Sequence, residues 1–94
     1  MDKFPCAIDE EAESFCDGIA ENMANIFDIE NEEAVGRINE HWKDVKIGGP
    51  NEIAYHEDAE FWAKQIYYEN GTYWWQAEWM KEHNPRAKPY SKTE

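Results

Sequence analysis

The sequence predicts a small all-α protein, a compact single domain of three to four short helices with a core rich in Trp and Tyr. Its 94 residues are enough for one domain. Of these residues 41% are hydrophobic and 15% aromatic, a composition typical of folded chains. We expect the core to centre on residues 55–80, because this stretch holds four of the five Trp and four of the five Tyr.

The first helix is predicted from Asp9 to Phe27 or Asp28, with Asp9 as the N-cap. Its apolar residues recur with a period of 3.6 over five turns. They are Ile8, Ala12, Phe15, Cys16, Ile19, Met23, Ile26 and Phe27. Residues 1–5 are expected to form a loose arm in which Phe4 and Pro5 are available to cover the edge of the core.

A second helix is predicted from about Glu32 to Asp44, with Asn31 as its cap. Its apolar residues, spaced three and four apart, are Val35, Ile38, Trp42 and Val45. Gly48, Gly49 and Pro50 then predict a flexible loop, since neither Gly nor Pro favours a continued helix. Residues 51–56 are expected to be extended, with Ile53 and Tyr55 turned toward the core.

A third amphipathic helix is predicted over residues 57–68, beginning near Tyr55 or His56. The pair Asn70-Gly71 can end this helix or turn a β-hairpin. The pattern of residues 72–80 favours a fourth short helix. The alternative is an α+β fold in which residues 65–68 pair with residues 73–76 across the Asn70-Gly71 turn.

The helical domain is predicted to span residues 1–83, followed by a flexible basic tail over residues 84–94. Charge is distributed unevenly along the chain. Residues 1–36 carry eleven acids and one base, whereas residues 80–94 carry two acids and four bases. The negative field therefore lies mainly in the N-terminal part.

The net charge of −12 opposes direct binding to nucleic acid or to anionic membranes and favours a basic protein partner. No stretch approaches the roughly 18–20 apolar residues of a membrane span, and the start of the chain lacks the features of a signal peptide. We therefore expect a cytoplasmic protein. Cys6 and Cys16 are expected to be reduced thiols, because on one helix they would be about 15 Å apart.

Four acidic residues of the first helix, Glu10, Glu13, Asp17 and Glu21, fall on the side opposite its apolar residues. One interpretation is a solvated face that keeps a small protein soluble. The other is a negative ridge that binds a basic or mixed protein partner. An inhibitor or a nucleic-acid mimic would use such a ridge, since it imitates the regular charges of a phosphate backbone.

The aromatic surplus is the second candidate for a partner-binding surface. The Trp and Tyr residues between positions 62 and 79 cannot all point inward from two short helices. Trp74 and Trp75 are therefore candidates for an exposed patch. Trp and Tyr are enriched at interaction hot spots. A homodimer formed through these side chains is compatible with every functional hypothesis for this chain.

An alternative is a small-ligand-binding or catalytic domain with a Trp-lined pocket, formed by His56, Glu60, Trp62 and Trp79. His56 and Glu60 are four residues apart, but the second His of a zinc motif is missing. The sequence therefore predicts no catalytic residue, no metal ligand set and no cofactor. The main expectation is a small acidic protein of the interaction class.

Overall fold

The longest helix, α1 (Glu10–Phe27), is the element on which the other helices pack. In a computed structural model, residues 3–69 and 71–90 are described. α1 begins where the carboxylate of Asp9 accepts a hydrogen bond from the Ala12 N–H (2.9 Å), and it ends at Asp28 in the left-handed conformation. The prediction for this helix and its N-cap is confirmed. Its buried residues are Ala12, Cys16, Ile19, Ala20 and Met23.

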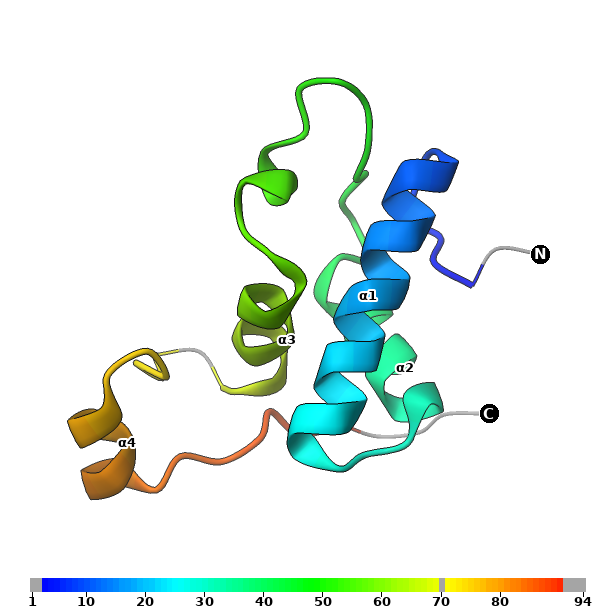
Figure 1. The fold of residues 1–94 in the computed structure, drawn as a ribbon. Helices are drawn as coiled ribbons and strands as arrows, with labels where there is room; N and C mark the ends of the chain where they lie inside the picture. Colours follow the sequence, from blue (N-terminus) through cyan, green and yellow to red (C-terminus); the bar gives the residue numbers. More distant parts are fainter. Residues whose placement is uncertain (1–2, 70, 91–94) are drawn as a thin grey trace.

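Two further helices, α2 (Asn31–His41) and α3 (Ala59–Tyr67), pack against α1 on neighbouring sides (Figure 1). A short 3-10 helix, η1 (Ile53–His56), precedes α3, and a small helix, α4 (Ala77–His83), lies apart from the other three. The all-α prediction is confirmed, because the described residues contain helices and only isolated backbone bridges.

The end of α2 differs from the prediction, which extended the helix to Asp44. The helix ends at His41, the chain turns, and Val45 is exposed rather than buried. The reason is a pair of backbone hydrogen bonds formed by Ile47, a few residues after the end of the helix. Ile47 accepts a hydrogen bond from the Ile8 N–H (3.0 Å) and donates one to the Cys6 carbonyl (2.8 Å), which draws the chain back to the N-terminal segment.

Residues 51–56 are not extended as predicted. Ile53 to His56 form η1, capped by the Glu52 carboxylate, and Ile53 is 75% exposed. The N-cap of α3 is Asp58, whose carboxylate accepts a hydrogen bond from the Phe61 N–H (2.9 Å), and not Tyr55 or His56. Asp is one of the residues preferred at an N-cap, so Asp58 takes this position in place of the residues before it.

The fourth helix is confirmed in kind but lies further along the chain than predicted, at Ala77–His83. The alternative hairpin is wrong, since residues 65–67 belong to α3 and Tyr68 pairs with Ala87 instead. Asn70 itself lies outside the described residues. We call residues 71–86, between the two sides of this pairing, the aromatic lobe.

The core is centred on α1 and α2 rather than on residues 55–80. That stretch supplies only Ala63 and Ile66 to the buried residues of the described chain. Aromatic residues do contribute, since Trp42 is buried and Tyr55, Trp62 and Tyr67 pack against the core from its edge. A helix can bury only one face, so the aromatic rings of the short helix α3 contact the edge of the core.

Residues 3–5, the described part of the predicted N-terminal arm, are docked rather than loose. Phe4 is fully buried, and the backbone carbonyl of Lys3 accepts a hydrogen bond from the side-chain amide of Asn39 on α2 (3.0 Å). Lys3 also forms an ion pair with Asp17 of α1 (2.6 Å). The arm therefore closes one side of the core, while Pro5 stays exposed.

The beginning of the predicted basic tail returns along the helical bundle. The Lys88 N–H donates to the Tyr67 carbonyl (2.8 Å), and the Lys88 carbonyl accepts from the guanidinium of Arg37 on α2 (2.6 Å). Gly36 leaves room there for the ring of Tyr90, which would have to shift if this position carried a Cβ. Residues 91–94 lie outside the described residues, and the domain boundary at residue 83 and the mobility of the tail stay predictions.

Cys6 and Cys16 are both free and buried, but they are neighbours, which the sequence did not predict. The estimate of about 15 Å assumed one helix for both, whereas Cys6 precedes α1 and its segment folds back beside it. The two thiols share a hydrogen bond, and burial raises the pKa of each above its ordinary value of 9.0.

The raised pKa values of the two thiols predict that the folded state becomes less stable at alkaline pH. The folded state holds both thiol protons more tightly than the unfolded state, so its stability is complete below about pH 9 and falls as the pH rises further. We expect the free energy of unfolding in urea to stay constant up to about pH 8 and to decrease as the pH rises above about 9. The decrease should be smaller in the double variant Cys6→Ala/Cys16→Ala. Equal slopes for both proteins would contradict the prediction.

Candidate functional site

The predicted acidic residues of α1 lie on its solvent side as a continuous surface. Glu10, Asp17 and Glu21 are exposed and Glu13 is half-buried. The helix turns 100° per residue, so these four fall within one arc of about 80°, which borders the buried side of the helix where Glu13 lies near Ala20. We call this set the acidic face. Glu10 and Glu13 also lie in the first turn, where the helix dipole favours negative charge.

The acidic face is poorly neutralised within the chain. Asp17 pairs with Lys3, whose pKa is raised by that hydrogen bond and by the charges of Asp17 and Glu13. In the described part of the chain, Glu10, Glu13 and Glu21 form no salt bridge. Elsewhere three acids form salt bridges with nearby bases, Glu33 with Arg37, Glu40 with Lys43 and Glu60 with Lys64.

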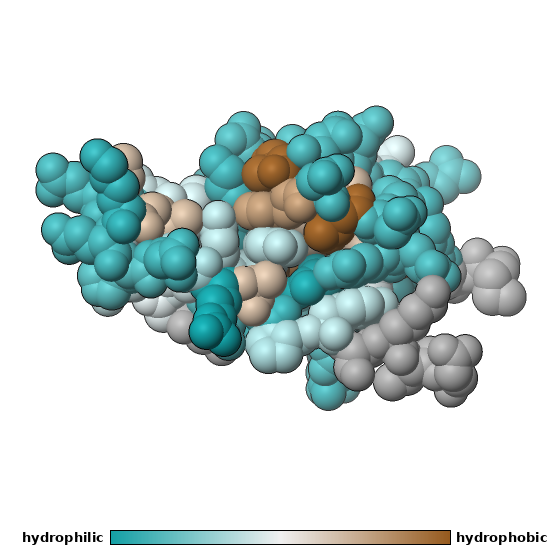
Figure 2. All heavy atoms as spheres, turned by 90° about the horizontal axis from the view of Figure 1, so that it is seen from below, coloured by the Kyte–Doolittle hydropathy of each residue, from teal (hydrophilic) through white to brown (hydrophobic). Residues whose placement is uncertain are grey.

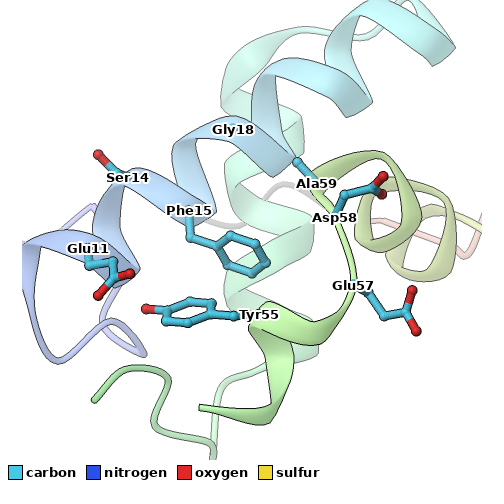
Figure 3. A pocket seen from close by; sticks show the side chains of 8 residues that line it. All are labelled: Glu11, Ser14, Phe15, Gly18, Tyr55, Glu57, Asp58 and Ala59. Carbon is cyan, nitrogen blue, oxygen red and sulfur yellow. The ribbon is translucent and has the colours of Figure 1, made fainter. Parts of the chain in front are cut away.

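A hollow of about 540 Å³ lies beside the acidic face, between α1 and the segment that joins η1 to α3 (Figure 3). The rings of Phe15 and Tyr55 meet edge to face in it, with centroids 4.9 Å apart. The remaining lining residues are Glu11, Ser14, Gly18, Glu57, Asp58 and Ala59. The hollow was not predicted from the sequence, because Phe15 and Tyr55 are brought together only by the path of the chain.

Burial and the neighbouring carboxylates of Asp9, Glu11 and Glu52 raise the pKa of Tyr55. Its hydroxyl oxygen is buried and has no hydrogen-bond partner among the described residues. The hollow is therefore both aromatic and electronegative. Of its carboxylates, that of Asp58 is engaged as the cap of α3, whereas Glu11 and Glu57 are exposed and form no salt bridge in the described chain.

The four residues of the alternative pocket are not brought together. His56 is exposed in η1, while Glu60 lies in α3 and pairs with Lys64 (3.0 Å), so the predicted shared helical face does not exist. Trp62 donates its indole N–H to the Ala54 carbonyl (2.8 Å). Trp79 stacks on His83 within α4, with ring centroids 4.1 Å apart.

The predicted aromatic patch is partly exposed. Trp75 is 58% exposed and Tyr73 is 45% exposed, at the tip of the aromatic lobe. Trp74 is half-buried, because its indole N–H donates to the Gln65 side chain (3.1 Å) and its ring contacts Phe61 at the edge. α4 contributes no buried residue to the core. The lobe is thus held to α3 mainly through Trp74.

The large aliphatic residues that are exposed in the described chain are Ile8, Ile26, Val45 and Ile53. The face seen from below is hydrophilic over most of its area, with the most apolar side chains gathered near the middle of the view and paler ones toward one end (Figure 2). The end of α1, which faces this side, carries the exposed residue Ile26. A patch of this size is ordinary for a monomer and carries no functional argument.

Within residues 3–69 and 71–90, no group of three His, Cys, Asp or Glu side chains is arranged to hold a metal ion. None of the helices in the described chain is long and apolar enough to cross a membrane. Comparison of the chain with protein-family models, with curated proteins and with solved structures gives no match.

Proposed function

We propose that this chain is a small interaction protein that binds a basic surface of a protein partner through the acidic face of α1. The single observation that supports this most is that Glu10, Glu13 and Glu21 form no salt bridge within the described chain. A helix with a mainly structural role gains from interleaved Lys or Arg, which this face lacks.

The charge arrangement is costly to the isolated chain. Glu13, Asp17 and Glu21 are spaced i, i+4 and i+8, and each like-charge pair of this kind destabilises a helix by roughly 0.2–0.5 kcal/mol. A partner that supplies Lys or Arg would remove this repulsion on binding. Complementary charge also accelerates association, by an amount that falls as ionic strength rises.

A regular row of carboxylates on a rigid helix suits an inhibitor or a mimic of nucleic acid, whose target would be a protein that binds phosphate backbones. The positive electrostatic potential of such a protein would attract every carboxylate of the acidic face. A cytoplasmic location is part of this proposal, because two reduced thiols suit that compartment.

The aromatic lobe is a second candidate surface, supported by the exposure of Trp75 and Tyr73. Exposed Trp side chains give large, rigid contact areas and are enriched in binding hot spots. In this second proposal the lobe binds a partner or a second copy of the chain. The two surfaces lie on separate elements, so substitutions can test each of them alone.

The proposal is tested by affinity capture of the tagged protein from cell lysate at low and at physiological salt. We expect a basic protein to be captured at low salt and to be recovered less efficiently at physiological salt, because screening weakens exposed charge pairs. Absence of any charge-dependent binding at both salt concentrations would refute the function proposed for the acidic face.

A further inference from the structure

The hollow beside the acidic face has the chemistry of a cation site. Phe15 and Tyr55 supply aromatic surface, Glu11 and Glu57 supply carboxylates, and none of the residues that line it is basic. Its volume of about 540 Å³ falls within the roughly 300–1,000 Å³ typical of small-ligand sites. The hollow is shallow and open to solvent, so a side chain can lie in it without being enclosed.

The shape and the hydrogen-bonding groups favour one kind of cation. A guanidinium is planar, stacks on aromatic rings and donates N–H groups in a fork that matches a carboxylate. An ammonium is a compact, strongly hydrated charge that gains less from aromatic walls. The buried hydroxyl oxygen of Tyr55, which has no partner in the described chain, is directed to the side of the hollow where Glu11 lies (Figure 3).

We infer that this hollow receives an arginine side chain of the basic partner, stacked on the aromatic surface of Phe15 and Tyr55 and paired with Glu11, the carboxylate that lies beside the Tyr55 hydroxyl (Figure 3). The inference rests on the function proposed above, because the hollow and the acidic face share α1. Ser14 and Gly18 line the hollow and follow Glu10 and Glu21 around the helix. One arginine can thus insert while neighbouring basic residues lie along the acidic face.

The probe for the experiment is the peptide acetyl-Gly-Arg-Gly-amide, titrated into the full chain and followed by amide NMR shifts. The matched probe contains citrulline, which keeps the shape of arginine without its charge. We expect saturable shifts centred on Phe15, Gly18, Tyr55 and Ala59, with at least tenfold weaker binding of the citrulline peptide. The lysine analogue should also bind more weakly than the arginine peptide.

Ser14→Trp is the decisive variant, because Ser14 is exposed at the rim of the hollow, so a large ring there covers the hollow without entering the core. Asn25→Trp is the control, an exposed position of the same helix about 16 Å further along. We expect the first variant to lose arginine binding and the second to retain it. Glu11→Gln should weaken binding several-fold.

Three results would overturn the inference. They are the absence of saturable shifts, equal binding by Ser14→Trp and the original chain, and shifts spread evenly over Glu10, Glu13 and Glu21. The last result would leave the function proposed for the acidic face standing, since diffuse attraction would then suffice. Conversely, arginine binding in the hollow together with a partner insensitive to the acidic face would refute the proposed function alone.

Discussion

The triple variant Glu10→Lys/Glu13→Lys/Glu21→Lys is expected to lose its partner while keeping its fold. These three carboxylates are unpaired in the described chain, so their reversal breaks no salt bridge seen there. Each attractive pair with the partner becomes a repulsive one, at about 1 kcal/mol or more per site. We expect affinity to fall about 100-fold or more, measured by calorimetry with the captured partner.

Asp17 is left unchanged in this variant for a structural reason. Its pair with Lys3 helps to hold the segment that carries the buried Phe4, so its reversal would disturb packing as well as charge. Lysine in the first turn of α1 opposes the helix dipole, at roughly 0.3–1 kcal/mol per residue. The Gln triple variant avoids most of this cost and should show a smaller loss of affinity in the same direction.

The control is a triple reversal in and next to the aromatic lobe, Glu69→Lys/Glu78→Lys/Glu82→Lys, which changes the net charge by the same amount. All three positions are exposed. Full affinity in this control would assign binding to the acidic face rather than to net charge. Equal losses in both variants would contradict that assignment. A partner kept by the first variant and lost by Trp75→Ser would place the site on the lobe.

The helices could be predicted from local patterns, and the interior could not. A period of 3.6 residues and an Asp cap were sufficient to place α1, because these signals lie within the element itself. The end of α2 depends instead on the pairing of Ile47 with Cys6 and Ile8, residues far away in the sequence. The apolar periodicity of the sequence continues to Val45, whereas the helix itself ends at His41.

The candidate sites divide in the same way. The acidic face was predicted, because four carboxylates on one side of a helix follow from spacing alone. The hollow was not, because it needs Tyr55 from η1 against Phe15 from α1. The density of Trp and Tyr in residues 55–80 suggested a core there. In the structure the exposed part of that density is the aromatic lobe, since α4 buries nothing.

Phe4→Ala is expected to cause the largest loss of stability from a single substitution outside the helices. The ring is fully buried in the core although it lies in a segment that the sequence predicts to be loose. Removal of a buried Phe side chain costs about 3–5 kcal/mol, through lost burial and the cavity that remains. A domain of this size has a total stability of roughly 5–14 kcal/mol, so the variant should be strongly destabilised.

The measurement is urea unfolding followed by Trp fluorescence, with Pro5→Ala as the control because Pro5 is adjacent and exposed. We expect the control to stay within about 0.5 kcal/mol of the original chain. Equal stability of the two variants would show that the segment before α1 is not docked. In that case the ion pair of Lys3 with Asp17 would also be lost, and Asp17 would join Glu10, Glu13 and Glu21 as a free carboxylate of the acidic face.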